Sequence, residues 1–392
     1  MKELATTELY RFRSPELIVA GNGALDALGG HLSVLGPLER VLVVAGSSMV
    51  RQGFTDRIAG QLEGLGISVR LLSGIRPEPT AGDIDALRAS LEGESFDAVI
   101  GIGGGSALDA AKLLSVLLTN EVSVVDLLGV DLVRNKGIPS AMIPSTSGTG
   151  SEVTPNAIVT LPEEELKIGA VSSHLLPRLV ILDPELTLEL PKEITAATGM
   201  DAFTHALESF ISNKANPFGD TFALESIRLL SRSMLRAYEH GDDLGARGDM
   251  LLGSMYGGAA LTASGTAAVH ALAYPLGGKF DIPHGVANAM LLPHVMEFNR
   301  EAIVDRLAAA ASAMGVDTAG QSAAQSADAA IRQIREWTRK LAIPQDLRRF
   351  GVTEADLGGL AEAASKVSRL LNNNPKKLEL ADIRKLYGEL LP

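Results

Sequence analysis

The sequence lacks cysteine altogether, which excludes one stabilising device and one class of metal ligand. Its 392 residues contain no Cys, so there are no disulfides, and any metal ion must be bound through nitrogen and oxygen atoms. The chain also lacks an excess of basic residues: 35 Lys and Arg against 47 Asp and Glu give a formal net charge of −12. Nucleic-acid binding needs a basic face for phosphate contacts, so this charge argues against that class.

Long apolar runs are missing as well. No segment reaches the roughly 18 consecutive apolar residues of a membrane-spanning helix, and the chain does not open with the basic start and apolar core of a signal peptide. We therefore expect a soluble, cytoplasmic protein. With 46% hydrophobic and 21% charged residues, the composition is that of a globular protein, and the length predicts two domains.

Short apolar runs alternate with helical segments in the first half of the chain. The runs at 40–46, 68–75, 96–106, 139–145 and 178–184 are mostly continuous, as expected of parallel strands covered on both faces. After residue 184 the chain is Ala- and Leu-rich helix, with breaks expected at Asn216-Pro217, Gly277-Gly278, Pro283, Pro344 and Asn372–Pro375. The sequence therefore predicts an α/β domain with a mostly parallel sheet (residues 1–184) and an all-α domain (residues 185–392).

Four potential metal ligands lie in the helical half. Asp201 and His205 are one turn apart in a helical segment, so their side chains project from one face. His270 lies in an Ala-rich helical run, and His284 follows Pro283 at an expected helix start. One carboxylate and three imidazoles suit a divalent ion such as Fe(II) or Zn(II). The alternative for each histidine is an ordinary hydrogen-bonded residue of the core or surface.

A glycine turn stands between an apolar strand and a helix at residues 103–106 (GGGS). Glycines let backbone N–H groups approach an anion, and the start of a helix favours negative charge. This turn is therefore a candidate phosphate site, although it is neither G-x-G-x-x-G nor a P-loop. A plain tight turn is the alternative.

A second loop, residues 144–152 (PSTSGTGSE), follows the next predicted strand and is rich in hydroxyl side chains and glycine. Such a loop can surround a pyrophosphate or a nicotinamide amide, and the alternative is a solvated Ser/Thr loop. Two anion-binding loops at successive strand ends favour a dinucleotide ligand.

Taken together, these segments resemble the signature motifs of the iron-containing (group III) alcohol dehydrogenases, a family related to glycerol dehydrogenase and dehydroquinate synthase. The motifs are GGGSALDAAK, PSTSGTGSEVT, DAFTHALESFIS and HALAYPLGGKFDIPHGVANAMLLPHV. The opening RSPELIVAGNGALDAL and Asn374-Pro375 also fit. The resemblance implies that residues 1–184 bind NAD(P), that residues 185–392 bind a divalent metal, and that the active site lies between the two domains. Relatives are often dimers, so we expect a homodimer.

The resemblance also implies a role for individual residues. The metal ligands are Asp201, His205, His270 and His284, and the catalytic candidates are His270, His284 and Tyr274. The coenzyme-binding candidates are Gly46, Ser47, Gly103, Gly104, Gly105, Ser106, Ser145, Thr146, Thr149 and Lys167. Asn156, Leu261 and Leu370 are expected to line the substrate pocket.

Two positions depart from the family pattern. Tyr274 stands where many members have a second His. If that His transfers a proton in those relatives, the Tyr274 hydroxyl, a metal-bound water or no particular group has that role here. Gly46 stands where relatives that use NAD often carry an Asp against the adenosine ribose. Without that carboxylate a 2′-phosphate is not repelled, and Ser47 and Ser48 offer hydrogen bonds to it. We therefore expect NADP(H) to be used at least as well as NAD(H).

The function predicted from these features is a metal-dependent oxidoreductase. It transfers a hydride between NAD(P)(H) and a small alcohol/aldehyde or hydroxy acid/ketone substrate. One alternative is a metal- and NAD-dependent lyase like dehydroquinate synthase, which needs several basic residues for an anionic sugar phosphate. The other is a metal-binding protein without catalysis.

Overall fold

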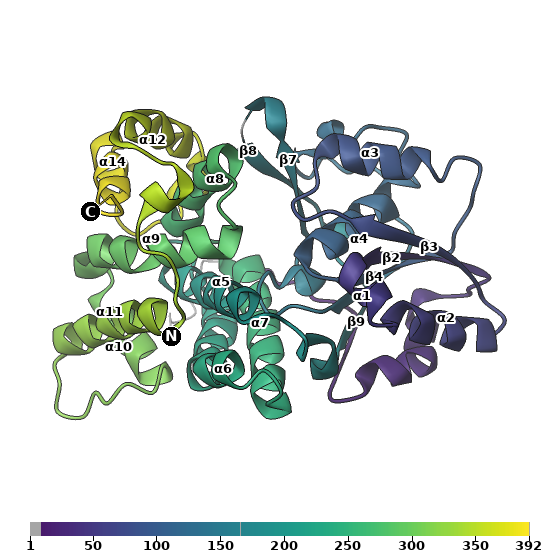
Figure 1. The fold of residues 1–392 in the computed structure, drawn as a ribbon, viewed down its shortest axis with the longest axis horizontal. Coiled ribbons are helices and arrows are strands. Elements are labelled where there is room, and N and C mark those ends of the chain that lie inside the picture. Colours follow the sequence, from purple (N-terminus) through teal and green to yellow (C-terminus); the bar gives the residue numbers. More distant parts are fainter. Residues whose placement is uncertain (1–8, 165, 392) are drawn as a thin grey trace. The chain divides into compact units, whose positions relative to one another are not determined.

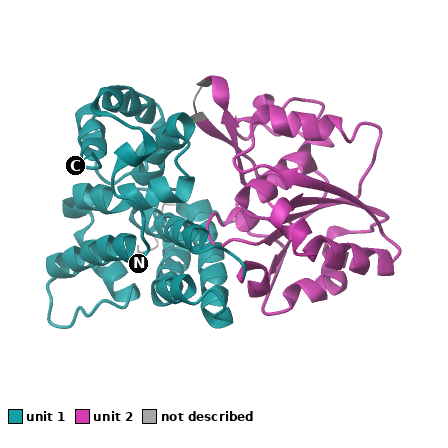
Figure 2. Ribbon diagram, viewed as in Figure 1, with its two compact units in different colours: residues 1–12, 189–392 teal, residues 13–188 magenta. Residues whose placement is uncertain are grey.

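The structure, a computed structural model, describes residues 9–164 and 166–391. The chain divides into two compact units (Figure 2): an α/β unit, residues 13–188, and a helical unit that contains the described residues from 189 onward and residues 9–12. The boundary drawn from the sequence, after residue 184, falls inside a 3-10 turn (η6, Pro184–Thr187) that belongs as a whole to the α/β unit. Phe12 joins the helical unit because its ring packs against Phe218 and Phe222, with centroids 6.0 and 5.0 Å apart.

A six-stranded sheet forms the centre of the α/β unit (Figure 1). Its strand order is β1-β9-β6-β4-β2-β3, and every pair is parallel. The strands are β1 (Leu17–Ala20), β2 (Arg40–Gly46), β3 (Ser68–Ile75), β4 (Ala98–Gly103), β6 (Ser140–Pro144) and β9 (Leu179–Leu182). Five of them coincide with the five apolar runs of the sequence, so these strand predictions and the α/β class are confirmed.

Helices cover both faces of this sheet. They are η1 (a 3-10 helix, Ala24–Leu35), α1 (Ser47–Arg51), α2 (Phe54–Gly64), α3 (Ala81–Ala89) and α4 (Gly105–Leu117). In β2, Leu42 and Val44 belong to the core formed with α3 and α4, whereas Val41, Val43 and Ala45 belong to the core formed with η1 and α2. Alternate residues of a strand face opposite sides, and both sides are buried here, so the strand is apolar throughout.

A second, small sheet was not predicted from the sequence. β7 (Asn156–Leu161) and β8 (Leu166–Val171) form an antiparallel pair, and β5 (Gly129–Val130) adds to β8 in parallel. This sheet matters for the site because β7 follows the Ser/Thr-rich loop and β8 carries Lys167.

The helical unit contains no strand among its described residues. Its helices are α5 (Lys192–Ile211), α6 (Pro217–Glu239), α7 (Leu244–Ser264), α8 (Ala268–Phe280), α9 (His284–Asn299), α10 (Val304–Ala313), α11 (Ala323–Lys340), α12 (Leu357–Ser365), α13 (Ser368–Leu371) and α14 (Leu380–Gly388). The all-α class is confirmed, as are the breaks before Pro217 and around Pro283, Pro344 and Asn372–Pro375. No helix in the described ranges is long and apolar enough to cross a membrane.

The break predicted at Gly277-Gly278 is wrong. Helix α8 runs through both glycines to Phe280 and stops at Asp281, whose φ is +53°. A glycine inside a helix costs about 1 kcal/mol relative to alanine, but Gly277 is buried against the helical core. Tertiary packing therefore overrides the local preference and moves the break to residues 281–283.

Candidate active site

Helix α5 supplies the first two members of a four-residue cluster. Asp201 and His205 lie one turn apart on its buried face and are 3% and 6% exposed. The Asp201 Oδ1 atom lies 3.9 Å from His205 Nε2. The helical spacing in the sequence therefore places both side chains on one face, as expected.

Helices α8 and α9 supply the other two members. His270 lies in the first turn of α8 and His284 is the first residue of α9. Their Nε2 atoms lie 3.9 and 3.7 Å from Asp201 Oδ1, and one ligand atom from each of the four residues lies within 4.8 Å of the others. Bond lengths of about 2.1 Å place neighbouring ligand atoms about 3–4 Å apart, so this N3O set fits a divalent ion.

The approach of α9 to α5 depends on Gly285. A Cβ atom at this position would lie 2.3 Å from the carbonyl oxygen of Ala197 and 3.3 Å from the Asp201 Cβ. Only a residue without a side chain lets the start of α9 lie this close to α5. Gly285 therefore allows His284 to reach Asp201.

The electrostatic surroundings of the cluster suit a cation. Burial alone would raise the pKa of Asp201, but the three facing imidazoles and the Asn288 amide outweigh it, so the pKa of this carboxyl is lowered. The Asn288 Nδ2 atom lies 2.7 Å from Asp201 Oδ1, and 3.2 and 3.1 Å from the Nε2 atoms of His270 and His284. The partly positive amide thus faces the same lone pairs that a metal ion would use.

Glu208 contacts the cluster through His270. It is fully buried, and its Oε2 lies 2.6 Å from His270 Nδ1, on the side of the ring away from Asp201. It also accepts hydrogen bonds from backbone N–H groups at the start of α8. Asp201, His205 and Glu208 follow the spacing of one helix face, and this pattern is the signal by which the sequence could have revealed Glu208.

Tyr274 lies beside the cluster, one helical turn after His270 on α8. Its ring centroid is 6.0 Å from that of His284, with an angle of 37° between the planes. The side chain is half-buried. The structure therefore places the Tyr274 ring next to that of His284.

The predicted coenzyme residues of the α/β unit gather at the carboxyl ends of three neighbouring strands. Gly46 ends β2, Gly103 ends β4, and Ser145 follows β6, in the parallel order β6-β4-β2. The Ser145 N–H donates to the Gly103 carbonyl at 2.8 Å. Carboxyl ends of neighbouring parallel strands are the usual ligand site of such sheets.

The two predicted coenzyme loops interlock closely. A Cβ atom on Gly105 would lie 2.6 Å from Thr149 Cγ2, and one on Gly104 would lie 3.4 Å from Thr146 Cγ2. Gly104, Gly105, Thr146 and Thr149 are half-buried. The two glycines therefore let the threonines lie against the start of the 13-residue helix α4. A helix start favours an anion, so these loops fit a dinucleotide phosphate.

The residues that follow β2 form the short helix α1. Gly46 has φ −65° and ψ 146°, which any residue adopts, and a Cβ there would meet only the Gly103 Cα at 3.8 Å and the Ala107 Cβ at 4.0 Å. Ser47 is exposed and Ser48 half-buried. The backbone at position 46 therefore accepts a residue with a Cβ atom without strain.

Lys167, predicted to face the coenzyme, forms an ion pair with Glu78. Glu78 adopts a left-handed backbone conformation, with φ +52°, and its N–H donates to Ser106 Oγ at 3.0 Å. It therefore connects the glycine turn, through Ser106, with strand β8. Sequence reasoning missed Glu78, and no local pattern marks it.

A buried lysine donates hydrogen bonds to the end of the Ser/Thr-rich loop. Lys112 of α4 is fully buried, and its Nζ donates to the carbonyl oxygens of Ser151 and Thr154 at 2.8 and 3.3 Å and to that of Asn156. Asp109 pairs with it at 3.4 Å. This lysine lies in the motif GGGSALDAAK, but the sequence reasoning gave it no role.

The predicted substrate-pocket residues are not brought together within one unit. Asn156 begins β7 in the α/β unit, whereas Leu261 on α7 and Leu370 on α13 belong to the helical unit. Leu261 is half-buried and Leu370 is 1% exposed in the helical core. Their part in substrate binding stays a prediction.

Comparison with known proteins finds the same family for both units of the chain. Residues 15–184 match the family model described as iron-containing alcohol dehydrogenase, and residues 195–391 match that of the Fe-containing alcohol dehydrogenase family, C-terminal. Long-chain-alcohol dehydrogenase 1 of Geobacillus thermodenitrificans is 40% identical over 95% of this chain and 94% of its own length. NADPH-dependent butanol dehydrogenase of Clostridium saccharobutylicum is 31% identical over 97% of each chain. The crystal structure of 1,3-propanediol oxidoreductase superposes with a TM-score of 0.93 at 34% identity, covering 98% of this chain and 100% of that one.

Proposed function

Because this chain belongs to the iron-containing alcohol dehydrogenase family, we propose that it interconverts a primary alcohol and its aldehyde, with NADP(H) used at least as well as NAD(H). The family establishes the reaction class, a metal-dependent alcohol oxidoreductase, and this prediction from the sequence is confirmed. The metal identity, the coenzyme preference, the substrate and the residue roles are proposals.

The cluster of Asp201, His205, His270 and His284 is the observation that carries the proposal. Three helices bring four buried or half-buried ligand groups to one point. A divalent ion held there, which we propose to be Fe(II) with Zn(II) as the alternative, supplies Lewis-acid polarisation of the alcohol or carbonyl oxygen. The protein's own contribution is the position and charge of the ligands and, we propose, a substrate hydrogen bond from Tyr274.

The coenzyme is proposed to bind at the carboxyl ends of β2, β4 and β6. Backbone N–H groups at Gly104 and Gly105 would hold its pyrophosphate, and the hydroxyls of Thr146 and Thr149 would hydrogen-bond the same part. Lys167, kept in place by Glu78, would face a ribose. When bound, the coenzyme would supply the hydride chemistry of its nicotinamide, and the residues of these loops would orient it and exclude water.

The substrate class follows from the relatives. The comparison proteins are named for long-chain alcohols, butanol and 1,3-propanediol, and we propose a primary alcohol as the substrate of this chain. The alternatives of a lyase and of a non-catalytic metal protein are not favoured, because these relatives are dehydrogenases or oxidoreductases. We also propose a cytoplasmic homodimer. The reaction draws on the cell's nicotinamide pool, and β1 is an edge strand of the sheet formed by the described residues, where a second copy would pair.

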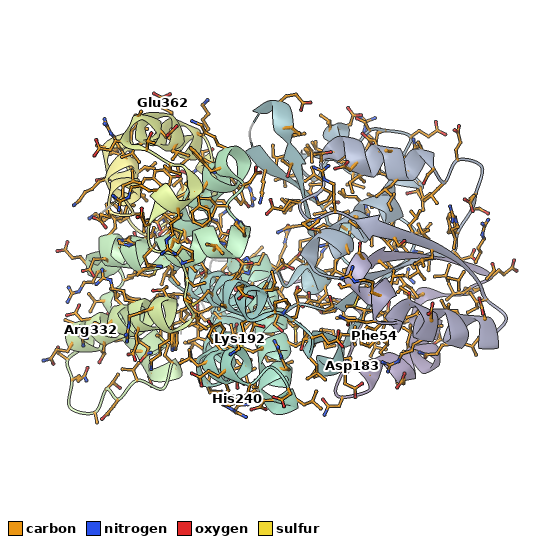
Figure 3. The ribbon with its side chains drawn as sticks, viewed as in Figure 1. Phe54, Asp183, Lys192, His240, Arg332 and Glu362 are labelled. Carbon is orange, nitrogen blue, oxygen red and sulfur yellow. The ribbon has the colours of Figure 1, made fainter. Side chains whose placement is uncertain are left out.

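The metal assignment is tested by His270→Ala and His284→Ala. Each variant is expected to lose bound metal and hydride transfer while keeping its circular dichroism spectrum, because each unit has its own core. Elemental analysis after reconstitution with Fe(II) or Zn(II) measures the ion. His240→Ala is a matched control, because His240 lies outside the cluster at the end of α6 (Figure 3). Undiminished stoichiometric metal in both site variants would end the assignment.

The coenzyme preference is tested by Gly46→Asp. A carboxylate there would face a 2′-phosphate, and repulsion of about 1–3 kcal/mol should raise KM for NADP(H) about 5- to 150-fold, with far less effect on NAD(H). A panel of primary alcohols, secondary alcohols and hydroxy acids, run with both coenzymes, tests the substrate class. A wild-type preference for NAD(H) of about a hundredfold, unmoved by Gly46→Asp, would show that the ribose binds elsewhere.

A further inference from the structure

We propose that Glu208 is a positioning residue of the metal centre, one that fixes the tautomer of His270 and anchors the start of helix α8 with the same carboxylate. This inference depends on the proposed metal site, but it concerns a residue that touches neither the ion nor the substrate in that scheme. It explains why a buried acidic side chain stands on the ligand-bearing face of α5.

Both oxygens of Glu208 act as hydrogen-bond acceptors. Oε2 lies 2.6 Å from His270 Nδ1 and accepts from the Ala267 N–H at 3.0 Å, while Oε1 accepts from the Val269 N–H at 2.6 Å. The side chain is 0% exposed, so bulk solvent does not reach these contacts. The His270 backbone N–H makes a longer contact with Oε2, at 3.5 Å, so four donors are shared between the two buried oxygens.

The contact with His270 determines which ring nitrogen carries the proton. A carboxylate oxygen without a proton only accepts, so Nδ1 must be the donor. Nε2 is then left with its lone pair directed at Asp201 Oδ1, 3.9 Å away, where the ion is proposed to bind. A carboxylate behind a ligating imidazole also increases the basicity of that ligand.

The contacts with Ala267 and Val269 replace a missing cap. The first N–H groups of a helix have no partner within it, and the residue at the cap position of α8, Ala267, has no side chain that could accept. Glu208 reaches over from α5 to satisfy two of these donors. One face of α5 therefore carries two proposed ligands, Asp201 and His205. Through Glu208 it also determines where His270 lies and which nitrogen of its ring holds the proton.

Glutamine cannot replace Glu208, although its size is the same. If its carbonyl oxygen faces His270, its NH2 group meets the Val269 N–H and leaves that donor unpaired. If the NH2 group faces His270 instead, Nδ1 must accept, so the proton moves to Nε2 and blocks metal binding. In the first arrangement the Val269 N–H loses its acceptor, and in the second the His270 Nδ1–H does.

Asp183 provides a matched control in the other unit. It is also 0% exposed, and its two oxygens accept from the backbone N–H groups of Gly23, Leu25 and Glu185 at 3.0–3.2 Å. It follows strand β9 and is labelled in Figure 3. Asp183→Asn therefore removes an equivalent buried acceptor without touching His270.

The experiment measures Co(II) binding to metal-free wild type, Glu208→Gln and Asp183→Asn, by titration of the visible d–d absorption. Glu208→Gln should bind Co(II) about 10- to 100-fold more weakly with an altered spectrum. Asp183→Asn should bind like wild type even where its melting temperature falls. Wild-type affinity and spectrum in Glu208→Gln would overturn the inference, as would equal weakening in both variants.

A second measurement does not depend on either variant folding. Nitrogen-15 NMR of metal-free wild type, with His270 assigned by comparison with His270→Gln, should show the proton on Nδ1. A proton on Nε2 alone would overturn the inference. Failure of wild type to bind Co(II) would refute the proposed metal site itself, whereas tight wild-type binding that Glu208→Gln leaves unchanged would refute only the role of Glu208.

Discussion

Replacing Glu152 by Gln should stabilise the protein at neutral and alkaline pH and have little effect near pH 4.5. Glu152 lies in the 3-10 turn η3 (Ser151–Val153) of the Ser/Thr-rich loop, is 1% exposed, and its Oε1 has no hydrogen-bond partner among the described residues. Lys112 and Asp109 are the charged groups beside it. Lys112 already has Asp109 as its ion-pair partner, so an ionised Glu152 adds an uncompensated buried charge.

The magnitude follows from the pKa of this carboxyl. Burial raises the pKa of Glu152 from 4.5 to about 7, against the opposing effects of its own backbone N–H and of Lys112. A group whose pKa is raised by folding contributes stability that is complete below pH 4.5 and is lost as the pH rises through about 7. At about 1.4 kcal/mol per pH unit, the free energy of unfolding falls by up to ~3 kcal/mol over this range. Gln carries no charge and avoids this loss.

The assay is urea unfolding of metal-free wild type and Glu152→Gln at a series of pH values from 4.5 to 8.5. The difference in the free energy of unfolding should grow by ~3 kcal/mol across this range, and all titrations shared by the two proteins cancel. Asp109→Asn is the control for the cluster. It should destabilise throughout, because it removes the partner of Lys112 and an acceptor for Ser151 and for the Ile158 N–H. Parallel pH profiles for wild type and Glu152→Gln would refute the reasoning.

Three further substitutions test the geometry of the site. Gly285→Ala places a Cβ 2.3 Å from the Ala197 carbonyl, so it should displace His284 and weaken Zn(II) binding at least ~10-fold; unchanged affinity in a calorimetric titration would contradict this. Tyr274→Phe should lower the hydride-transfer rate by about 10²-fold if the hydroxyl holds a reacting proton, and an unchanged rate and pH profile would leave it a packing role only. The Cβ of Gly105→Ala would lie 2.6 Å from Thr149 Cγ2, so this substitution should raise KM for the coenzyme and leave the metal content at the wild-type level. Coenzyme titration and elemental analysis would check the two outcomes.

Local features of the chain were enough to predict much of the fold and part of the site. The continuous apolar run of β2 signals a strand covered on both faces, because both its odd and its even positions are buried in the structure. The spacing of Asp201 and His205 is a property of the helix itself, so their common face needs no tertiary information. The glycine turn at 103–106 is likewise set by the residues between one strand and the next helix.

Other features depend on contacts between residues far apart in the chain, and only the tertiary structure determined them. Glu208 and His270 are 62 positions apart, and their hydrogen bond exists because α5 and α8 pack together. The β7–β8 pair and the Glu78–Lys167 ion pair likewise join distant segments. Gly277 was predicted to break a helix, yet it lies inside α8 because burial outweighs its local preference. Local preferences act within a turn or two of the chain, whereas contacts such as that of Glu208 with His270 are made by the packing of distant helices. The sequence alone therefore pointed to the four candidate ligands that cluster in the structure, but not to Glu208.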